Sequence, residues 1–168
     1  MRKSSHEVAV HEAAHAVIGR VLGLTCGHAT IVPNEAEGEA GHAILGDPWH
    51  VLDNWEQRAK FREPSSVYRG RILATMAGAE AQTELRGGCG GGDGHDRREI
   101  ELMAASDYAD LPDAVWQRYE PRMRRQTRRL IRKHRDKIER VAAALLERDT
   151  LTANEIDAIV DRATDAKA

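Results

Sequence analysis

Two histidines and a glutamate near the start of the chain have the spacing of a metal-dependent hydrolase. They are His11, Glu12 and His15, in the sequence HEAAH. On a helix, residues four apart project from nearly the same face, so both imidazoles could bind one zinc ion at about 2.0–2.1 Å. Glu12, about 100° around the helix from His11, could flank the ion and act as general base toward an attacking water. This pattern predicts a zinc-dependent peptidase.

The same pattern also arises by chance, as two histidines of an ordinary amphipathic helix, in many proteins that are not proteases. A zinc site needs a third protein ligand. The metzincin extension is excluded, because Ile18 and Val21 stand where it requires Gly and His. Spacing alone leaves several other carboxylates and imidazoles open as the third ligand: Glu80, Glu84, Asp93, Asp96, His28, His42, His50 and His95.

Helices must position most of these residues. The first is predicted over residues 4–23, because Ser4 and Glu7 have capping-box spacing and the apolar residues that follow recur with a period near 3.6. Breaks rich in Gly and Pro separate further periodic segments. These segments predict helices over 66–86, from 98 to about 109, over 113–147 with an interruption at Pro121, and from Thr152, which has Glu155 at capping-box spacing.

A small β-hairpin is predicted near residues 28–46, where two β-prone segments flank a polar turn that contains glycine. Residues 49–64 are expected to form a loop or short helix whose apolar side chains pack against the domain. The glycine tract at 87–94 is predicted to be a flexible loop inside one domain, 1–168. The expected fold is therefore mainly α, with α+β character. An exposed strand of the hairpin could bind an extended peptide, and the sequence leaves open which strand is at the edge.

Composition narrows the class of protein only coarsely. Lys and Arg number 25 and Asp and Glu 27, so the net charge of −2 neither requires nor excludes a charged partner. The two cysteines, Cys26 and Cys89, form no C-x-x-C pair, as is typical of a reducing compartment. No apolar run reaches the roughly 20 residues of a membrane span, and residues 1–15 lack the apolar core of a signal peptide. We expect a soluble, cytoplasmic protein without a membrane span.

Five segments of the chain, taken in order, resemble the peptidase domain of the FtsH-type AAA+ zinc metalloproteases. Their shared order over most of the 168 residues carries the resemblance, because no single later segment is specific. The resemblance implies a helical, zincin-like peptidase domain. The segments are HEAAHAVIG, ATIVPNEAEGEAGHAI, ATMAGAEAQTEL, GGGDGHDRREIELMA and KIERVAAALLERDTLTANEID.

The resemblance also implies roles for single residues. His11 and His15 match the histidine ligands, Glu12 matches the catalytic base, and Asp96 matches the third zinc ligand, with His95 where the family usually has Asn. From the residues alone, an aspartate just before a helix is more often an N-cap than a ligand. The implied activity is that of a Zn²⁺ metalloendopeptidase that hydrolyses unfolded or flexible polypeptides.

Some positions depart from the family pattern. The family tends to carry a glutamate pair where this chain has Gln82 and Thr83, so a carboxylate that orients a histidine is missing or is supplied by Glu80 or Glu84. Both glutamates can also be interpreted as solvent-exposed helix surface. No G-x-x-x-x-G-K-S/T loop occurs, so the ATP-driven unfolding module of the family is not in this sequence. Substrates would then be unfolded or flexible already, or be delivered by a separate partner chain. The rings of the family also imply self-association into a homo-oligomer.

Two other classes of function are alternatives. The first is a module of the same fold that binds a peptide or partner with weak or no turnover. The second is a nucleic-acid-binding protein that uses the Arg- and Lys-rich stretch 118–140. An apolar stripe runs through that stretch and aromatic residues are scarce, which disfavours nucleic acid and fits a solvated helix face or a surface for an acidic partner.

Overall fold

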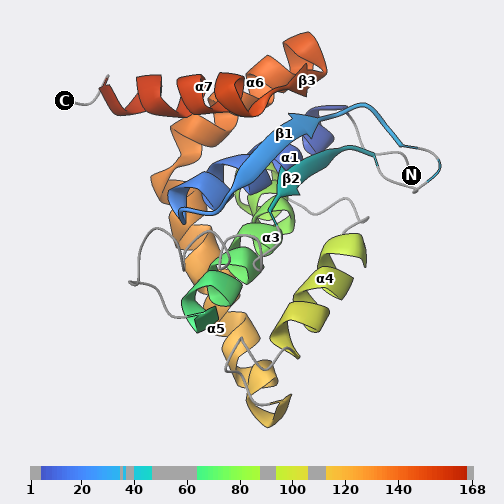
Figure 1. Ribbon diagram of the computed structural model, residues 1–168, viewed down its shortest axis with the longest axis vertical. Coiled ribbons are helices and arrows are strands. Elements are labelled where there is room, and N and C mark those ends of the chain that lie inside the picture. Colours follow the sequence, from blue (N-terminus) through green and yellow to red (C-terminus); the bar gives the residue numbers. More distant parts are fainter. Residues whose placement is uncertain are drawn as a thin grey trace.

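The computed structural model describes residues 5–34, 36, 40–46, 64–87, 94–105 and 113–165. In these ranges the chain forms six helices and a small three-stranded antiparallel sheet (Figure 1). The predicted fold class, mainly α with a small β component, is therefore confirmed. The helices are α1 Ser5–Val21, α3 Pro64–Arg86, α4 Gly94–Ala104, α5 Asp113–Lys133, α6 Arg135–Arg148 and α7 Ala153–Asp165. The strands are β1 Cys26–Thr30, β2 His42–Leu45 and β3 Thr150–Leu151.

Helix α1 lies at the centre of the fold. Every residue from Val8 to Gly19 is buried, because α3, α6 and the sheet all contact this helix. A helix that is buried on all sides belongs to the core rather than to the surface. The three residues of the H-E-x-x-H motif therefore lie inside the protein, where polar side chains need partners.

The sheet has the strand order β2-β1-β3, so β1 is central and β2 is an edge strand. The predicted hairpin is confirmed as the pair β1 and β2, with Ala29 opposite Ala43. The third strand was not predicted, because two residues are too few to produce an alternating pattern. It is held beside β1 by a hydrogen bond of 2.7 Å between the hydroxyls of Thr30 and Thr150.

The long basic helix is interrupted at a different residue from the one predicted. Helix α5 continues through Pro121 and ends at Lys133, and His134 separates it from α6. A proline removes only one backbone N–H donor, and burial of Met123 and Thr127 keeps the following turns packed against the body of the protein. The interruption predicted at Pro121 is therefore wrong.

The starts of two other helices, α4 and α7, can also be compared with the predicted ones. Helix α4 begins at Gly94, one turn earlier than predicted. The capping box before α7 is confirmed, since Thr152 N–H donates to Glu155 Oε2 at 2.8 Å and Glu155 N–H donates to Thr152 Oγ1 at 3.4 Å.

Several predictions concern residues outside the described ranges. These are the Ser4 half of the first capping box, the segment 49–63, most of the glycine tract, and Cys89. Within the described ranges, none of the helices combines the length and the apolar character that crossing a membrane would require.

Candidate metal centre

Helix α1 places two imidazoles side by side in the core. The ring centroids of His11 and His15 are 4.6 Å apart and the ring planes are 83° from parallel. Both residues are almost fully buried, with 6% and 5% of their surface exposed. The i, i+4 spacing puts both Nε2 atoms on the side of α1 that faces α3 and α4.

Helix α4 adds a carboxylate to this pair. The Oδ2 atom of Asp96 lies 3.0 Å from His11 Nε2 and 3.4 Å from His15 Nε2. Asp96 belongs to the first turn of α4 and does not precede the helix, so it is not the N-cap that spacing alone allowed. The structure thus brings together the two histidines and the aspartate that the family resemblance assigned.

Among the described residues, these three form the only group of three or more His, Cys, Asp or Glu side chains that could share an ion. One ligand atom of each lies within 4.8 Å of the others. Two imidazole nitrogens and one carboxylate oxygen are a donor set that binds catalytic zinc and leaves a fourth position open. The donor chemistry and the convergence therefore fit the implied metal.

Two further observations support this fit. Asp96 Oδ2 is buried and lies close to both Nε2 atoms, but neither contact has the geometry of a regular hydrogen bond, as expected for three ligand atoms that converge on a shared cation. On α3, a Cβ atom added to Gly78 would lie 2.5 Å from His15 Nε2 and 2.6 Å from His11 Nε2. The space beside both nitrogens exists because residue 78 has no side chain.

A backbone carbonyl orients one of the imidazoles. His15 Nδ1 lies 2.8 Å from the carbonyl oxygen of Ala74 on α3. A carbonyl can only accept, so Nδ1 carries the proton, and in the neutral ring Nε2 keeps its lone pair for a metal. This is the outer contact that metal-binding histidines usually make. Sequence reasoning missed it, because a backbone carbonyl leaves no mark in the residue types.

Without a metal, the site is a buried ion pair. Burial lowers the pKa of His15, but the charge and close contact of Asp96, the charge of Glu12 and the contact to Ala74 together outweigh burial and raise the pKa to about 9. Burial likewise raises the pKa of Asp96, but His15 and His11 outweigh it and hold that pKa well below its ordinary value. The carboxylate is therefore ionised and the imidazole protonated at neutral pH. A bound cation would replace the proton as the partner of Asp96.

Glu12 supplies a second carboxylate beside the imidazoles. It is 6% exposed, and its negative charge also contributes to the raised pKa of His15. It follows His11 directly on α1 and is near enough for its charge to act on His15, but it does not belong to the group that could share an ion. A buried carboxylate that is not itself a ligand is what the role of general base requires.

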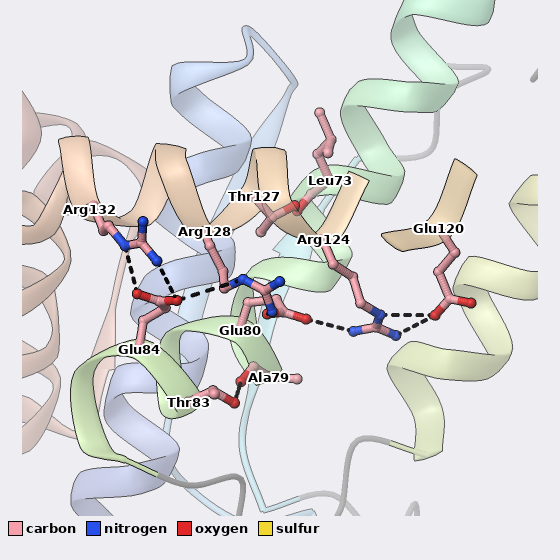
Figure 2. A network of polar contacts seen from close by, with 10 residues as sticks. All are labelled: Leu73, Ala79, Glu80, Thr83, Glu84, Glu120, Arg124, Thr127, Arg128 and Arg132. Carbon is pink, nitrogen blue, oxygen red and sulfur yellow. Dashed lines mark hydrogen bonds and ion pairs between the residues drawn. The ribbon is translucent and has the colours of Figure 1, made fainter. Parts of the chain in front are cut away.

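The contacts of Glu80 and Glu84 run to arginines of α5 (Figure 2). Glu80 is only 5% exposed and accepts from Arg124 at 2.8 Å and from Arg128 at 2.9 Å. The interpretation of Glu80 as solvent-exposed helix surface is therefore wrong. The carbonyl of Ala74, rather than either glutamate, provides the orienting contact to His15 that the structure shows.

The other candidate ligands lie elsewhere or outside the described residues. His28 and His42 contact each other across β1 and β2, with their Nε2 atoms 3.1 Å apart. His95 is exposed and lies 3.5 Å from Glu99. Asp93 and His50 fall outside the described ranges.

The basic stretch of α5 is partly neutralised within the protein. Arg124, Arg128 and Arg132 each form ion pairs with a glutamate of α3. Phosphate groups could bind these guanidinium groups only by competing with carboxylates that already hold them. The geometry thus favours a structural role for this face of α5 and weakens the nucleic-acid alternative.

The comparisons with known proteins give no match: no protein-family model fits the chain, and no curated protein is similar to it. These comparisons therefore add nothing to the geometry of the site, which is given by its own residues.

Proposed function

We propose that this protein is a zinc metalloendopeptidase in which His11, His15 and Asp96 hold the ion and Glu12 is the general base. The observation that carries the proposal is the convergence of two Nε2 atoms and one carboxylate oxygen from helices that are far apart in sequence. A buried cluster of this composition next to a further buried carboxylate is typical of a hydrolytic site.

The residues of the proposed site have two kinds of role, which are binding the metal ion and transferring a proton. Zinc bound by this group would supply a Lewis acid that polarises a peptide carbonyl and lowers the pKa of water. The Ala74 carbonyl keeps the His15 ring in the orientation and tautomer needed for binding. Glu12 takes the proton of the attacking water and delivers it to the leaving amine nitrogen.

The edge strand β2 offers a way to hold the substrate. In the sheet order β2-β1-β3, one side of β2 pairs with β1 and the other side is at the edge. An extended peptide can add to such an edge through backbone hydrogen bonds, with little demand on its sequence. Because folded proteins expose few extended segments, the proposed substrates are unfolded or flexible polypeptides.

The resemblance to the FtsH-type peptidases supports the same proposal, because it implies Asp96 as the third ligand independently of the geometry of the site. We place the protein in the cytoplasm and expect its substrates to be unfolded already or to be delivered by a separate partner chain. Assembly of the chain itself into a homo-oligomer is part of the same proposal. No step of the proposed reaction requires ATP.

Cleavage of an unstructured protein tests this function. Wild-type protein loaded with zinc is incubated with casein, in parallel with a Glu12→Gln variant. The variant should keep one zinc per chain by elemental analysis and lose about 10²–10⁴-fold in cleavage rate, the usual contribution of a general base. Equal cleavage by both proteins would remove Glu12 from the mechanism. Zinc binding without cleavage by either protein would favour the peptide-binding alternative.

A further inference from the structure

We infer that Gly78 is the residue that keeps the metal centre open, and that any side chain at this position excludes the ion. The inference rests on the metal centre proposed above. A Cβ atom at position 78 would lie 2.5 Å from both His11 Cε1 and His15 Nε2, and 2.6 Å from His11 Nε2. Non-bonded carbon contacts are favourable only at about 3.5–4.0 Å, so one methyl group would overlap both rings.

The backbone itself does not require glycine at this position. Gly78 lies in the interior of α3, and the described glycines with positive φ are Gly23 and Gly87. Alanine is a better helix former than glycine, so helix formation alone would favour alanine here. The close approach of α3 to the two imidazoles is what excludes a side chain.

Helix α3 cannot move away to make room, because contacts fix it on both sides of Gly78. On one side, Thr127 of α5 donates to the carbonyl oxygen of Leu73 at 3.4 Å. On the other side, the buried Glu80 is held by Arg124 and Arg128 of α5 (Figure 2). A backward shift of α3 would break a buried ion-pair network, which is strongly destabilising.

The contact to α1 fixes the same segment from its other face. Gln82 is fully buried and donates from Nε2 to the carbonyl oxygen of Glu7 at 3.0 Å. The imidazoles must therefore give way to an added methyl group. The ring of His15 would have to rotate, although its Nδ1 is hydrogen-bonded to Ala74 of α3. Its Nε2 would then move away from Asp96.

Gly70 is a matched control on the same helix. A Cβ atom there would meet its nearest neighbours, Leu24 Cδ2 and Leu22 Cβ, at 3.7 and 3.9 Å, which are ordinary contacts. Gly70→Ala and Gly78→Ala are therefore the same chemical change in one helix, and only the second adds a methyl group beside the imidazoles.

The test measures zinc affinity by competition with a chromogenic chelator, together with the helix content of the metal-free proteins by circular dichroism. Gly70→Ala should bind zinc as the wild type does. Gly78→Ala should keep its helix content and lose at least about 100-fold in affinity, more than the loss of an outer contact usually costs. Wild-type affinity in a folded Gly78→Ala protein would overturn the inference.

A second background covers the case in which Gly78→Ala does not fold. In a His11→Ala, His15→Ala double variant the two rings are absent. Adding Gly78→Ala to it should therefore give a folded protein that is at least as stable as the double variant itself. Loss of folding in that background would place the clash elsewhere and overturn the inference. If the wild type binds no zinc, the proposed function fails, and this comparison still measures whether Gly78 makes room for the imidazoles.

Discussion

Asp96 Oδ2 lies 3.0 Å from His11 Nε2, although the first residue is on α4 and the second on the central helix α1. Helix α3 lies against both and brings them together. A hydrogen bond of 3.4 Å from Arg71 of α3 to Glu99 of α4 supports this arrangement one turn beyond Asp96. The candidate metal centre is thus a product of three helices rather than of one motif.

The role of Asp96 can be separated from that of its neighbour in sequence. Asp96→Asn should lower zinc affinity by more than the 10–100-fold that is typical of losing an outer partner, because it removes a charged ligand. His95→Ala should leave the affinity unchanged, since His95 is exposed and its ring lies near Glu99. Zinc titration in the presence of a competing chelator measures both. If Asp96→Asn kept the zinc affinity of the wild type while His95→Ala lowered it, His95 rather than Asp96 would be the third ligand.

The metal-free protein should lose stability as the pH rises from about 6.5 to 9. The pKa of His15 is 6.5 in the unfolded chain and about 9 in the fold, where burial lowers it and Asp96, Glu12 and the contact to Ala74 together raise it by more. A group whose pKa is raised on folding binds its proton more tightly in the native state. Its contribution is therefore complete below pH 6.5 and is lost through pH 9.

Asp96 acts at the opposite end of the pH range. Its pKa is lowered on folding, so its contribution is present above the ordinary value of 3.8 and is lost as the pH falls below that value. Urea unfolding of the protein in the presence of a chelator measures both limbs. The decline above pH 6.5 should be weaker in Asp96→Asn, because the carboxylate that raises the pKa of His15 is absent. A wild-type midpoint that is constant from pH 6.5 to 9 would contradict the buried ion pair.

Glu80 should matter for folding more than Glu84 does. Glu80→Ala removes the buried carboxylate that Arg124 and Arg128 share, while each arginine keeps a second glutamate partner, and should lower the free energy of unfolding by about 1–3 kcal/mol. Glu84→Ala removes a more exposed partner of Arg132 on the same helix and should have a much smaller effect. Urea denaturation of the metal-free proteins compares the two variants. Equal losses would show that the network does not depend on burial of Glu80.

Sequence reasoning predicted the local features of the site better than the long-range ones. The spacing of His11 and His15 and the period of the first helix are local, and one turn of helix is enough to bring the rings together. Asp96 could not be chosen by spacing, because its place depends on how α3 and α4 fold back against α1. It was assigned through the resemblance to a known family.

Contacts made by the backbone could not be predicted at all. The Ala74 carbonyl leaves no mark in the residue types, and Gly78 is visible in the sequence only as a glycine inside a helical pattern. Such a glycine often has a packing reason, but the pattern does not say which group approaches it. The break at His134 was missed because proline was expected to end the helix, whereas tertiary packing carried α5 through Pro121.

The most direct test of the central claim is a crystal structure of the zinc-loaded protein with anomalous data at the zinc edge. We expect one strong peak within about 2.0–2.2 Å of His11 Nε2, His15 Nε2 and a carboxylate oxygen of Asp96, the distances of zinc to nitrogen and oxygen ligands. A peak bound elsewhere, or zinc-free crystals grown with excess zinc in which these three side chains stay as an ion pair, would contradict the account.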